Sequence, residues 1–182
     1  TSYNIIRSPK SYNSQVGVPL SVWRMKSEND LAIIEAGISM PGEMVKLERI
    51  IRPTIGVFTN LGQAHDENFT DANQKAREKL DLFQNVDTLI YCKDYLVIQE
   101  ELAHYPFNST PQLFGWSRRT AADLQIGSSR SVQSLIFILG ILYALPDQLE
   151  SSQLIRPFGS PSIRNIFIVF PNIICLSSLF YN

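Results

Sequence analysis

The stretch LAIIEAG, residues 31–37, decides the fold, because it joins a short apolar run to a turn of small residues. A run without an alternating polar face is typical of a strand that is buried on both sides in a parallel sheet. Pro41-Gly42-Glu43 follows it and predicts the start of a helix, in which Met44, Leu47 and Ile50-Ile51 recur at helical spacing. The stretch therefore predicts a buried strand followed by an amphipathic helix.

The same alternation continues through residue 92. The sequence TIGVFT (54–59) predicts a second strand, residues 71–83 a helix with Ala72, Ala76, Leu80 and Phe83 on one face, and residues 88–92 a third strand. This order is typical of an α/β domain with a doubly wound, mostly parallel sheet and helices on both faces. Ligands bind such sheets at the carboxyl ends of the strands, where Glu35 and the turn 59–65 fall.

The composition is that of a globular protein. The 182 residues are 45% hydrophobic and 18% charged, which suits a single domain with its own core. A net charge of -1 gives no reason to expect nucleic acid or an anionic membrane as a partner. Cys92 and Cys175 lack metal-ligand spacing, so we expect buried thiols in a reducing compartment. The chain begins at Thr1 without a signal peptide, so we expect a fragment and a cytoplasmic location.

The composition changes from about residue 127, where Ser, Ile, Leu and Phe dominate and acidic residues nearly vanish. We therefore expect a central domain over residues 1–126 and a divergent apolar part over 127–182 that packs on the same domain. The apolar run 135–145 is short, and Pro171 and Asn172 interrupt the run 166–181. Because a membrane span takes about 20 apolar residues, we expect buried helices or strands.

Four segments, in this order, resemble the central ATPase domain of Mur ligases, the bacterial enzymes of peptidoglycan synthesis, of the type that adds D-alanyl-D-alanine. They are RSPKSYNSQVGVPL (7–20), IEAG with PGE (34–37 and 41–43), RP through TNLGQAH (52–65), and AREKLDLF (76–83). The first resembles the segment after the P-loop helix, most closely in the form fused to an alanine racemase. The order and spacing make the resemblance specific over residues 5–95.

The resemblance implies a role for each of several residues. Glu35 binds the magnesium that is shared with the ATP phosphates, and His65 and Lys79 are catalytic residues of a second magnesium site. Lys79 is carbamylated in this family, which supplies the oxygen ligands that Mg²⁺ prefers. The remaining expected contacts are Asn60 beside the phosphates, Asn165 at the adenine, and Asn13 and Ser14 at the UDP-sugar-peptide.

The residues by themselves also suit plainer roles. Glu35 then caps a neighbouring helix, since a charge in an apolar strand needs a partner. His65 is a hydrogen-bonded turn residue, and Lys79 is a solvated lysine on an amphipathic helix. The residue types alone do not decide between these roles and metal binding.

The resemblance also implies a reaction and its partners. ATP phosphorylates the terminal carboxylate of UDP-N-acetylmuramoyl-tripeptide, and the amine of D-alanyl-D-alanine attacks the acyl phosphate while Mg²⁺ offsets its charge. The 182 residues, however, contain no Gly-x-x-Gly-Lys-[Thr/Ser], the P-loop whose amides and lysine hold phosphates. We therefore expect a fragment of the ligase that hydrolyses no ATP by itself.

Three alternatives stay open. The missing P-loop favours a catalytically inactive Mur-like remnant that serves as a binding or structural domain. A folate-type ligase of the same superfamily adds glutamate, but residues 8–15 and the Pro41-Gly42-Glu43 start argue against it. A non-enzymatic, membrane-associated protein would depend on the apolar tail.

Overall fold

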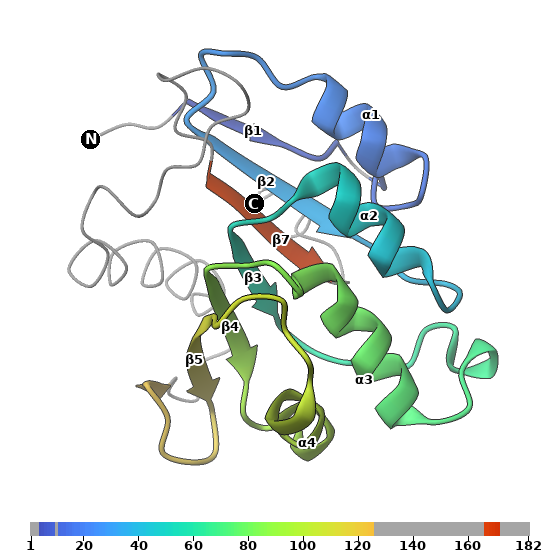
Figure 1. Ribbon diagram of the computed structural model, residues 1–182, viewed down its shortest axis with the longest axis vertical. Coiled ribbons are helices and arrows are strands. Elements are labelled where there is room, and N and C mark those ends of the chain that lie inside the picture. The colour runs from blue at the N-terminus through green and yellow to red at the C-terminus, as the bar shows by residue number, and fades with distance from the viewer. Residues whose placement is uncertain (1–3, 10, 126–165, 172–182) are drawn as a thin grey trace, which may run out of the picture.

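The computed structural model describes residues 4–9, 11–125 and 166–171. These residues form one seven-stranded sheet in which every pair of neighbouring strands is parallel, in the order β1-β2-β7-β3-β4-β5-β6 (Figure 1). The expected α/β class with a mostly parallel sheet is confirmed. The strands are β1 (Ile5–Arg7), β2 (Leu31–Ala36), β3 (Ile55–Phe58), β4 (Thr88–Cys92), β5 (Gln112–Ser117), β6 (Leu124–Gln125) and β7 (Ile166–Pro171).

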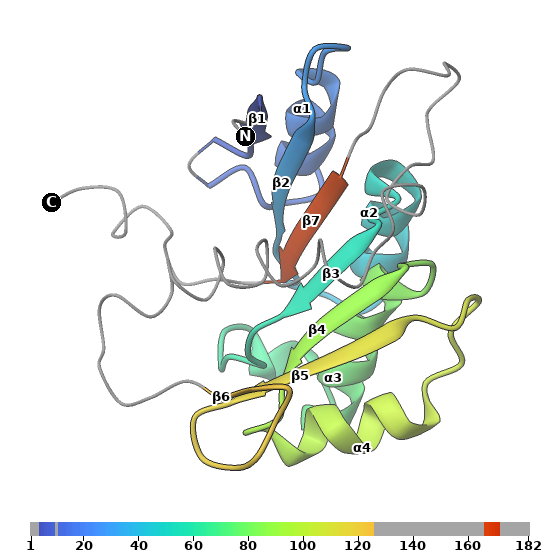
Figure 2. The same cartoon turned by 90° about the vertical axis from the view of Figure 1, so that its left-hand side faces the viewer.

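The described α-helices lie in one layer on one face of this sheet (Figure 2). They are α1 (Gly17–Trp23), α2 (Glu43–Ile51), α3 (Ala72–Leu80) and α4 (Leu96–His104), with 3₁₀ turns η1 (Asp66–Asn68) and η2 (Asp81–Phe83). Each helix contacts the next, because β1 to β5 advance across the sheet in one direction and right-handed crossovers then fall on the same face. Helices on the second face stay a prediction.

The predicted strands and helices form close to their expected bounds, with two exceptions in side-chain burial. Met44, Leu47 and Ile51 of α2 are buried, but Ile50 is exposed, since it lies off the face that packs on the sheet. The expected apolar face of α3 is buried at Ala76 and Leu80, and Phe83 of η2 is buried with them. Ala72 is exposed, because it begins the helix at the surface.

Strand β7 comes from the apolar part of the chain beyond residue 126. Its backbone lies between β2 and β3, with Ile166 opposite Leu31 and Pro171 opposite Ala36. Two strands that are consecutive in the sequence are thus separated by one from far along the chain. The run 135–145, Asn165 and Cys175 lie outside the described residues, so the predictions made for them stay predictions, as does the domain boundary after residue 126.

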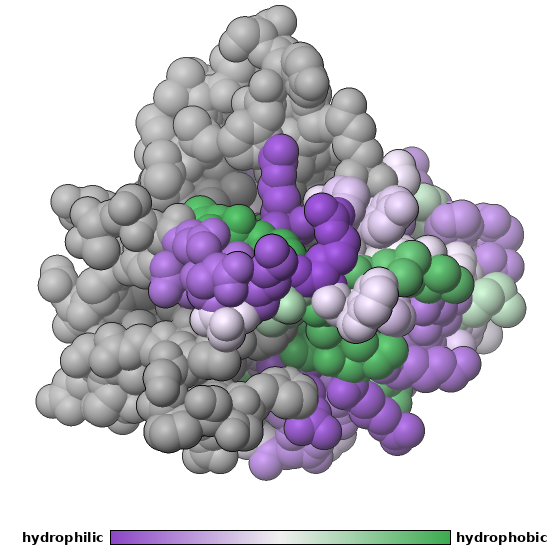
Figure 3. Space-filling view, turned by 90° about the horizontal axis from the view of Figure 1, so that it is seen from above, coloured by the Kyte–Doolittle hydropathy of each residue, from purple (hydrophilic) through white to green (hydrophobic). Residues whose placement is uncertain are grey.

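Membrane crossing has no support in the part of the chain that the structure describes, where no helix is long and apolar enough to span a bilayer. The described surface seen from above mixes hydrophilic and apolar patches (Figure 3). Some large apolar side chains are exposed, among them Trp23, which is 84% exposed at the end of α1. Cys92 is a buried free thiol, and burial raises its pKa to about 11.

Candidate functional site

Three loops follow the carboxyl ends of β1, β2 and β3. The first carries Asn13 and Ser14 and the third carries Asn60 and His65, whereas Glu35 lies in β2 itself and Lys79 in α3. The loops are residues 8–16, 37–42 and 59–71, and the last of them lies at the right of Figure 1, between β3 and α3. Since parallel strands end at the same edge, the three loops share one end of the sheet.

Glu35 and Asn13 meet at the end of β2. Asn13 Nδ2 donates a hydrogen bond of 3.1 Å to Glu35 Oε1, and the amide of Gly37 donates to the Asn13 carbonyl at 2.6 Å. Burial raises the pKa of Glu35 above its ordinary value, although the hydrogen bond from Asn13 lowers it. The carboxylate is thus half-buried and is held by a side-chain amide rather than by a helix terminus.

Ser14 stabilises the turn that leads into helix α1. Its Oγ accepts hydrogen bonds from the amides of Val16 and Gly17, at 3.4 and 3.2 Å. Gly17 fits here because a Cβ at this position would lie 2.6 Å from the Cα of Tyr12, closer than real side chains approach. The tight packing fixes the loop that carries Asn13; contact of Asn13 and Ser14 with a substrate stays a prediction.

The Pro41-Gly42-Glu43 turn ties the second loop to the third. The Glu43 carboxylate accepts from the amides of Ser39 and Met40, at 2.6 and 2.9 Å. Burial raises the pKa of Glu43, but these hydrogen bonds outweigh it and leave the pKa below its ordinary value. Two contacts then cross to the next segment: Asn68 Nδ2 donates to the Ser39 carbonyl at 2.9 Å, and the Gly42 amide donates to Glu78 Oε2 at 2.6 Å.

Lys79 is fully buried beneath the third loop. Its Nζ donates to the carbonyl oxygens of Asn60 and Leu61, at 3.2 and 2.5 Å, and lies 5.8 Å from the centre of the Phe58 ring. Burial, and next the charge of Lys75, lower the pKa of Lys79 to about 7, while Asp66 opposes the shift. The structure thus brings Asn60 and Lys79 together and excludes a solvated Lys79.

Lys75 is a second buried lysine, which sequence reasoning missed. It lies one helical turn before Lys79, and its Nζ donates to the carbonyls of Gly62 and Ala64 and to Asp66 Oδ1, at 3.2, 2.6 and 2.5 Å. The signal was available, since residues four apart share one face of a helix. Once Lys79 is expected to face the site, Lys75 is expected to face it too.

His65 has an unusual backbone and an open side chain. It precedes η1 with φ 61° and ψ 24°, in the left-handed region that few non-glycine residues adopt. Its side chain is 50% exposed, and Nδ1 lies 3.9 Å from Glu67 Oε1. Among the described residues it makes no hydrogen bond or ion pair with Glu35 or Lys79.

The donor set fits magnesium at one part of this edge and not at another. Within the described ranges, no three His, Cys, Asp or Glu side chains form a group that could hold a metal by themselves. Glu35 offers a carboxylate, and the buried Thr59 Oγ1 at the end of β3 has no hydrogen-bond partner, so both suit a hard cation. The Lys79 ammonium does not fit, because it donates to carbonyls; only a carbamate would offer oxygens.

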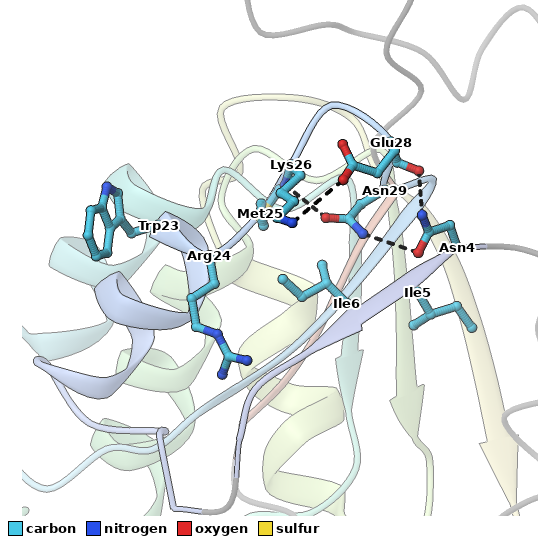
Figure 4. Close-up of a pocket in the computed structure, with 9 residues that line it drawn as sticks. All are labelled: Asn4, Ile5, Ile6, Trp23, Arg24, Met25, Lys26, Glu28 and Asn29. Carbon is cyan, nitrogen blue, oxygen red and sulfur yellow. Dashed lines mark hydrogen bonds and ion pairs between the residues drawn. The ribbon is translucent and has the colours of Figure 1, made fainter.

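One hollow of the described surface adjoins the predicted site, and another lies at the opposite end of the sheet. A hollow of about 640 Å³ lies beside the third loop and is lined by residues that include Gln63, Asp66 and Tyr95. The other, of about 550 Å³, lies at the amino end of the sheet between β1 and the end of α1, with Trp23 and Arg24 on its wall (Figure 4). Because parallel sheets bind ligands at their carboxyl ends, the first hollow suits a ligand site better.

Comparison of this sequence with known proteins shows to which family the chain belongs. The sequence profile of the Mur ligase middle domain matches residues 1–133 of this chain. The chain belongs to the Mur ligase family. This Mur ligase segment is 29% identical over 102 residues to the UDP-N-acetylmuramoyl-tripeptide--D-alanyl-D-alanine ligase of Bacillus subtilis, which covers 54% of the chain. It is 32% identical over 104 residues, 56% of the chain, to the ligase of the same name from Borreliella burgdorferi.

The Mur ligase segment spans only part of these relatives, 22% of the length of each. Among solved structures it resembles the MurF ligase of Thermotoga maritima in complex with ADP, with a TM-score of 0.55 and 20% identity over 65% of this chain and 27% of that one. This likeness supports the fold, an α/β domain with a mostly parallel sheet. The resemblance noted from the sequence is thereby confirmed at the level of the family.

Proposed function

We propose that this segment forms the magnesium-binding side of an ATP-dependent ligase that adds D-alanyl-D-alanine to UDP-N-acetylmuramoyl-tripeptide in peptidoglycan synthesis, in the cytoplasm. The observation that carries the proposal is the match of residues 1–133 to the Mur ligase middle domain. The D-alanyl-D-alanine-adding names of the relatives from B. subtilis and B. burgdorferi support the substrate pair.

Glu35 is the first group to which we assign a role. Its half-buried carboxylate, oriented by Asn13, holds a magnesium ion. Such an ion, when bound, offsets the charge of a transferring phosphoryl group. Asn13 thereby positions the carboxylate, and with Ser14 it lies where we expect the UDP-sugar-peptide.

Lys79 and His65 form the second part of the proposed site. The pKa of about 7 leaves a large share of Lys79 as the neutral amine, the form that adds carbon dioxide and loses a proton to become a carbamate. Carbamylation leaves one N–H on Nζ and adds carboxylate-like oxygens, so one of the two carbonyls, of Asn60 or Leu61, must turn away or find another donor. His65 needs a smaller rearrangement than Lys79 to reach a metal ion, because its side chain is already half exposed.

The phosphate side of the site is not assigned to this segment. Its 182 residues contain no P-loop, so we derive no step through bound ATP here. The same observation favours a second candidate, an inactive Mur-like domain that keeps the fold and binds the UDP-peptide without turning it over. Adenine contact by Asn165 lies outside the described residues.

The experiment measures the binding of two ligands to the full chain. One is Mn²⁺, a paramagnetic substitute for Mg²⁺, and the other is the UDP-tripeptide. Glu35→Gln removes the proposed charge, and Glu28→Gln serves as the control because it is an exposed carboxylate at the other end of the sheet. We expect Glu35→Gln to weaken Mn²⁺ binding by about tenfold or more, since a ligand is lost, and Glu28→Gln to leave it unchanged.

The outcomes separate the two candidates. Binding of both the metal and the UDP-tripeptide, with loss of the metal in Glu35→Gln, supports the magnesium-side proposal. Binding of the UDP-tripeptide without metal supports the inactive domain. Mn²⁺ affinity that is equal in Glu35→Gln and the unaltered chain contradicts the role of Glu35.

A further inference from the structure

Lys75 is a buried cation that the proposed function leaves without a role. Its Nζ has three oxygen acceptors, the carbonyls of Gly62 and Ala64 and the carboxylate of Asp66, which match the three donors of an ammonium group. It also lies 5.7 Å from the centre of the Phe69 ring. A buried ammonium with this many partners is fixed in position, so its acceptors are fixed as well.

The acceptors of Lys75 bracket His65 in the sequence. Gly62 and Ala64 come before it, and Asp66 follows it directly. His65 itself has a left-handed backbone, which persists only where surrounding contacts impose it. Lys79, in contrast, binds the carbonyls of Asn60 and Leu61, farther from His65 along the loop.

We propose that Lys75 is the positioning residue of the His65 turn. It draws residues 62, 64 and 66 toward α3 and so imposes the left-handed backbone that directs the imidazole outward, to the carboxyl end of the sheet. Among the described residues the imidazole is paired only with Glu67, at the long distance of 3.9 Å, so the main chain rather than a side-chain partner determines where it points. That the placed imidazole binds a metal ion rests on the proposed function, whereas the control of the turn by Lys75 does not.

The test uses the full chain and four variants. Lys75→Met keeps the length and loses the donors, and Lys75→Arg keeps the cation. Lys46→Met changes an exposed lysine on α2, and Leu102→Ala removes buried volume on α4, away from the loop. Two quantities are measured by NMR: amide hydrogen exchange of residues 62–66 relative to the global unfolding rate, and the Mn²⁺-induced broadening of the His65 imidazole.

We expect Lys75→Met to raise exchange of residues 62–66 on the order of tenfold, because local opening no longer breaks three bonds to one ammonium. We expect it to weaken the Mn²⁺-induced broadening of the His65 imidazole signal by about 10–100-fold, the usual cost of losing a group that orients a ligand. Lys75→Arg restores part of both, and Lys46→Met changes neither. Leu102→Ala lowers global stability without a selective effect on residues 62–66.

Unchanged exchange in Lys75→Met overturns the proposal, and so does an equal, selective rise in Leu102→Ala. Failure of Lys75→Arg to restore either quantity overturns the requirement for a cation. If Mn²⁺ broadens no His65 signal in the unaltered chain, the metal role in the proposed function fails, while the exchange rates still decide whether Lys75 holds the turn.

Discussion

At the end of β2, Glu35 accepts a hydrogen bond from Asn13, whereas at the end of β3 two buried lysines donate to four main-chain carbonyls and a carboxylate. The first region keeps a half-buried carboxylate, the group to which we assign the magnesium ion in the proposed function. The second has its polar groups satisfied internally, so it needs a chemical change at Lys79 before it can bind metal. In the proposed function, one carboxyl edge thus combines a carboxylate that is already present with a carbamate that has to form at Lys79.

The largest expected effect concerns ATP turnover. Both regions lack the P-loop that anchors phosphates, so the purified chain with Mg²⁺, ATP and both substrates is expected to release no phosphate above the blank. Phosphate release detected by a coupled assay checks this. Sustained turnover that is abolished by Glu35→Gln would contradict it, because the Glu35 carboxylate would then suffice without a phosphate cradle.

The two lysines are expected to differ in stability. Lys75→Met should lower the free energy of unfolding by about 2–4 kcal/mol, since it leaves two carbonyls and Asp66 unpaired. Lys79→Met should change it by no more than about 1 kcal/mol at pH 7, because relief from burying the amine offsets two lost hydrogen bonds. Urea unfolding measures both, and equal losses would remove the distinction.

Stability should also depend on pH through Lys79. Its pKa is about 7 in the fold against an ordinary value of 10.5. Between these values the unfolded chain binds a proton that the folded chain does not, so the free energy of unfolding increases as the pH rises. From pH 7 to pH 9 we expect the unaltered chain to gain about 2 kcal/mol relative to Lys79→Met, at about 1.4 kcal/mol per pKa unit. Urea unfolding at the two pH values tests this, and a constant difference between the two proteins would contradict it.

The smallest effect is expected at Glu35. Its pKa is raised by burial, so the folded state favours the protonated form, and stability falls as the pH rises from the ordinary value of 4.5 through the raised one. At pH 7 Glu35→Gln should therefore be neutral or stabilising by up to about 1 kcal/mol, since glutamine keeps an acceptor for Asn13. Thermal unfolding checks this, and a clear loss of stability would mean that Glu35 is a structural charge.

Much of the fold could be predicted from local patterns, and particular residues show where such prediction stops. Residues 88–92 form the expected strand, and the helix expected from Asp71 begins at Ala72, because Asp71 caps it by accepting from the Gln74 amide at 2.7 Å. The place of β7 between β2 and β3 could not be predicted, because a sequence period gives a strand's faces but not its neighbours.

For the candidate site, the resemblance to Mur ligases singled out Asn13, Glu35, Asn60, His65 and Lys79, which their residue types alone did not. The sequence did not show that Asn13 donates to Glu35, or that Asn60 offers its carbonyl rather than its side chain to Lys79. Such contacts depend on where two loops meet in space, and the pattern along either loop carries no information about the other.

The sequence by itself determined the family, the succession of strands and helices, and the end of the sheet where its polar residues gather, because these follow from the order and period of residues along the chain. The tertiary structure alone decided that Lys75 and Lys79 are both buried and that their ammonium groups donate to main-chain carbonyls of the loop after β3. A lysine on a helix is solvated or buried according to what covers it, and here the cover is a loop that offers its carbonyls to the two ammonium groups.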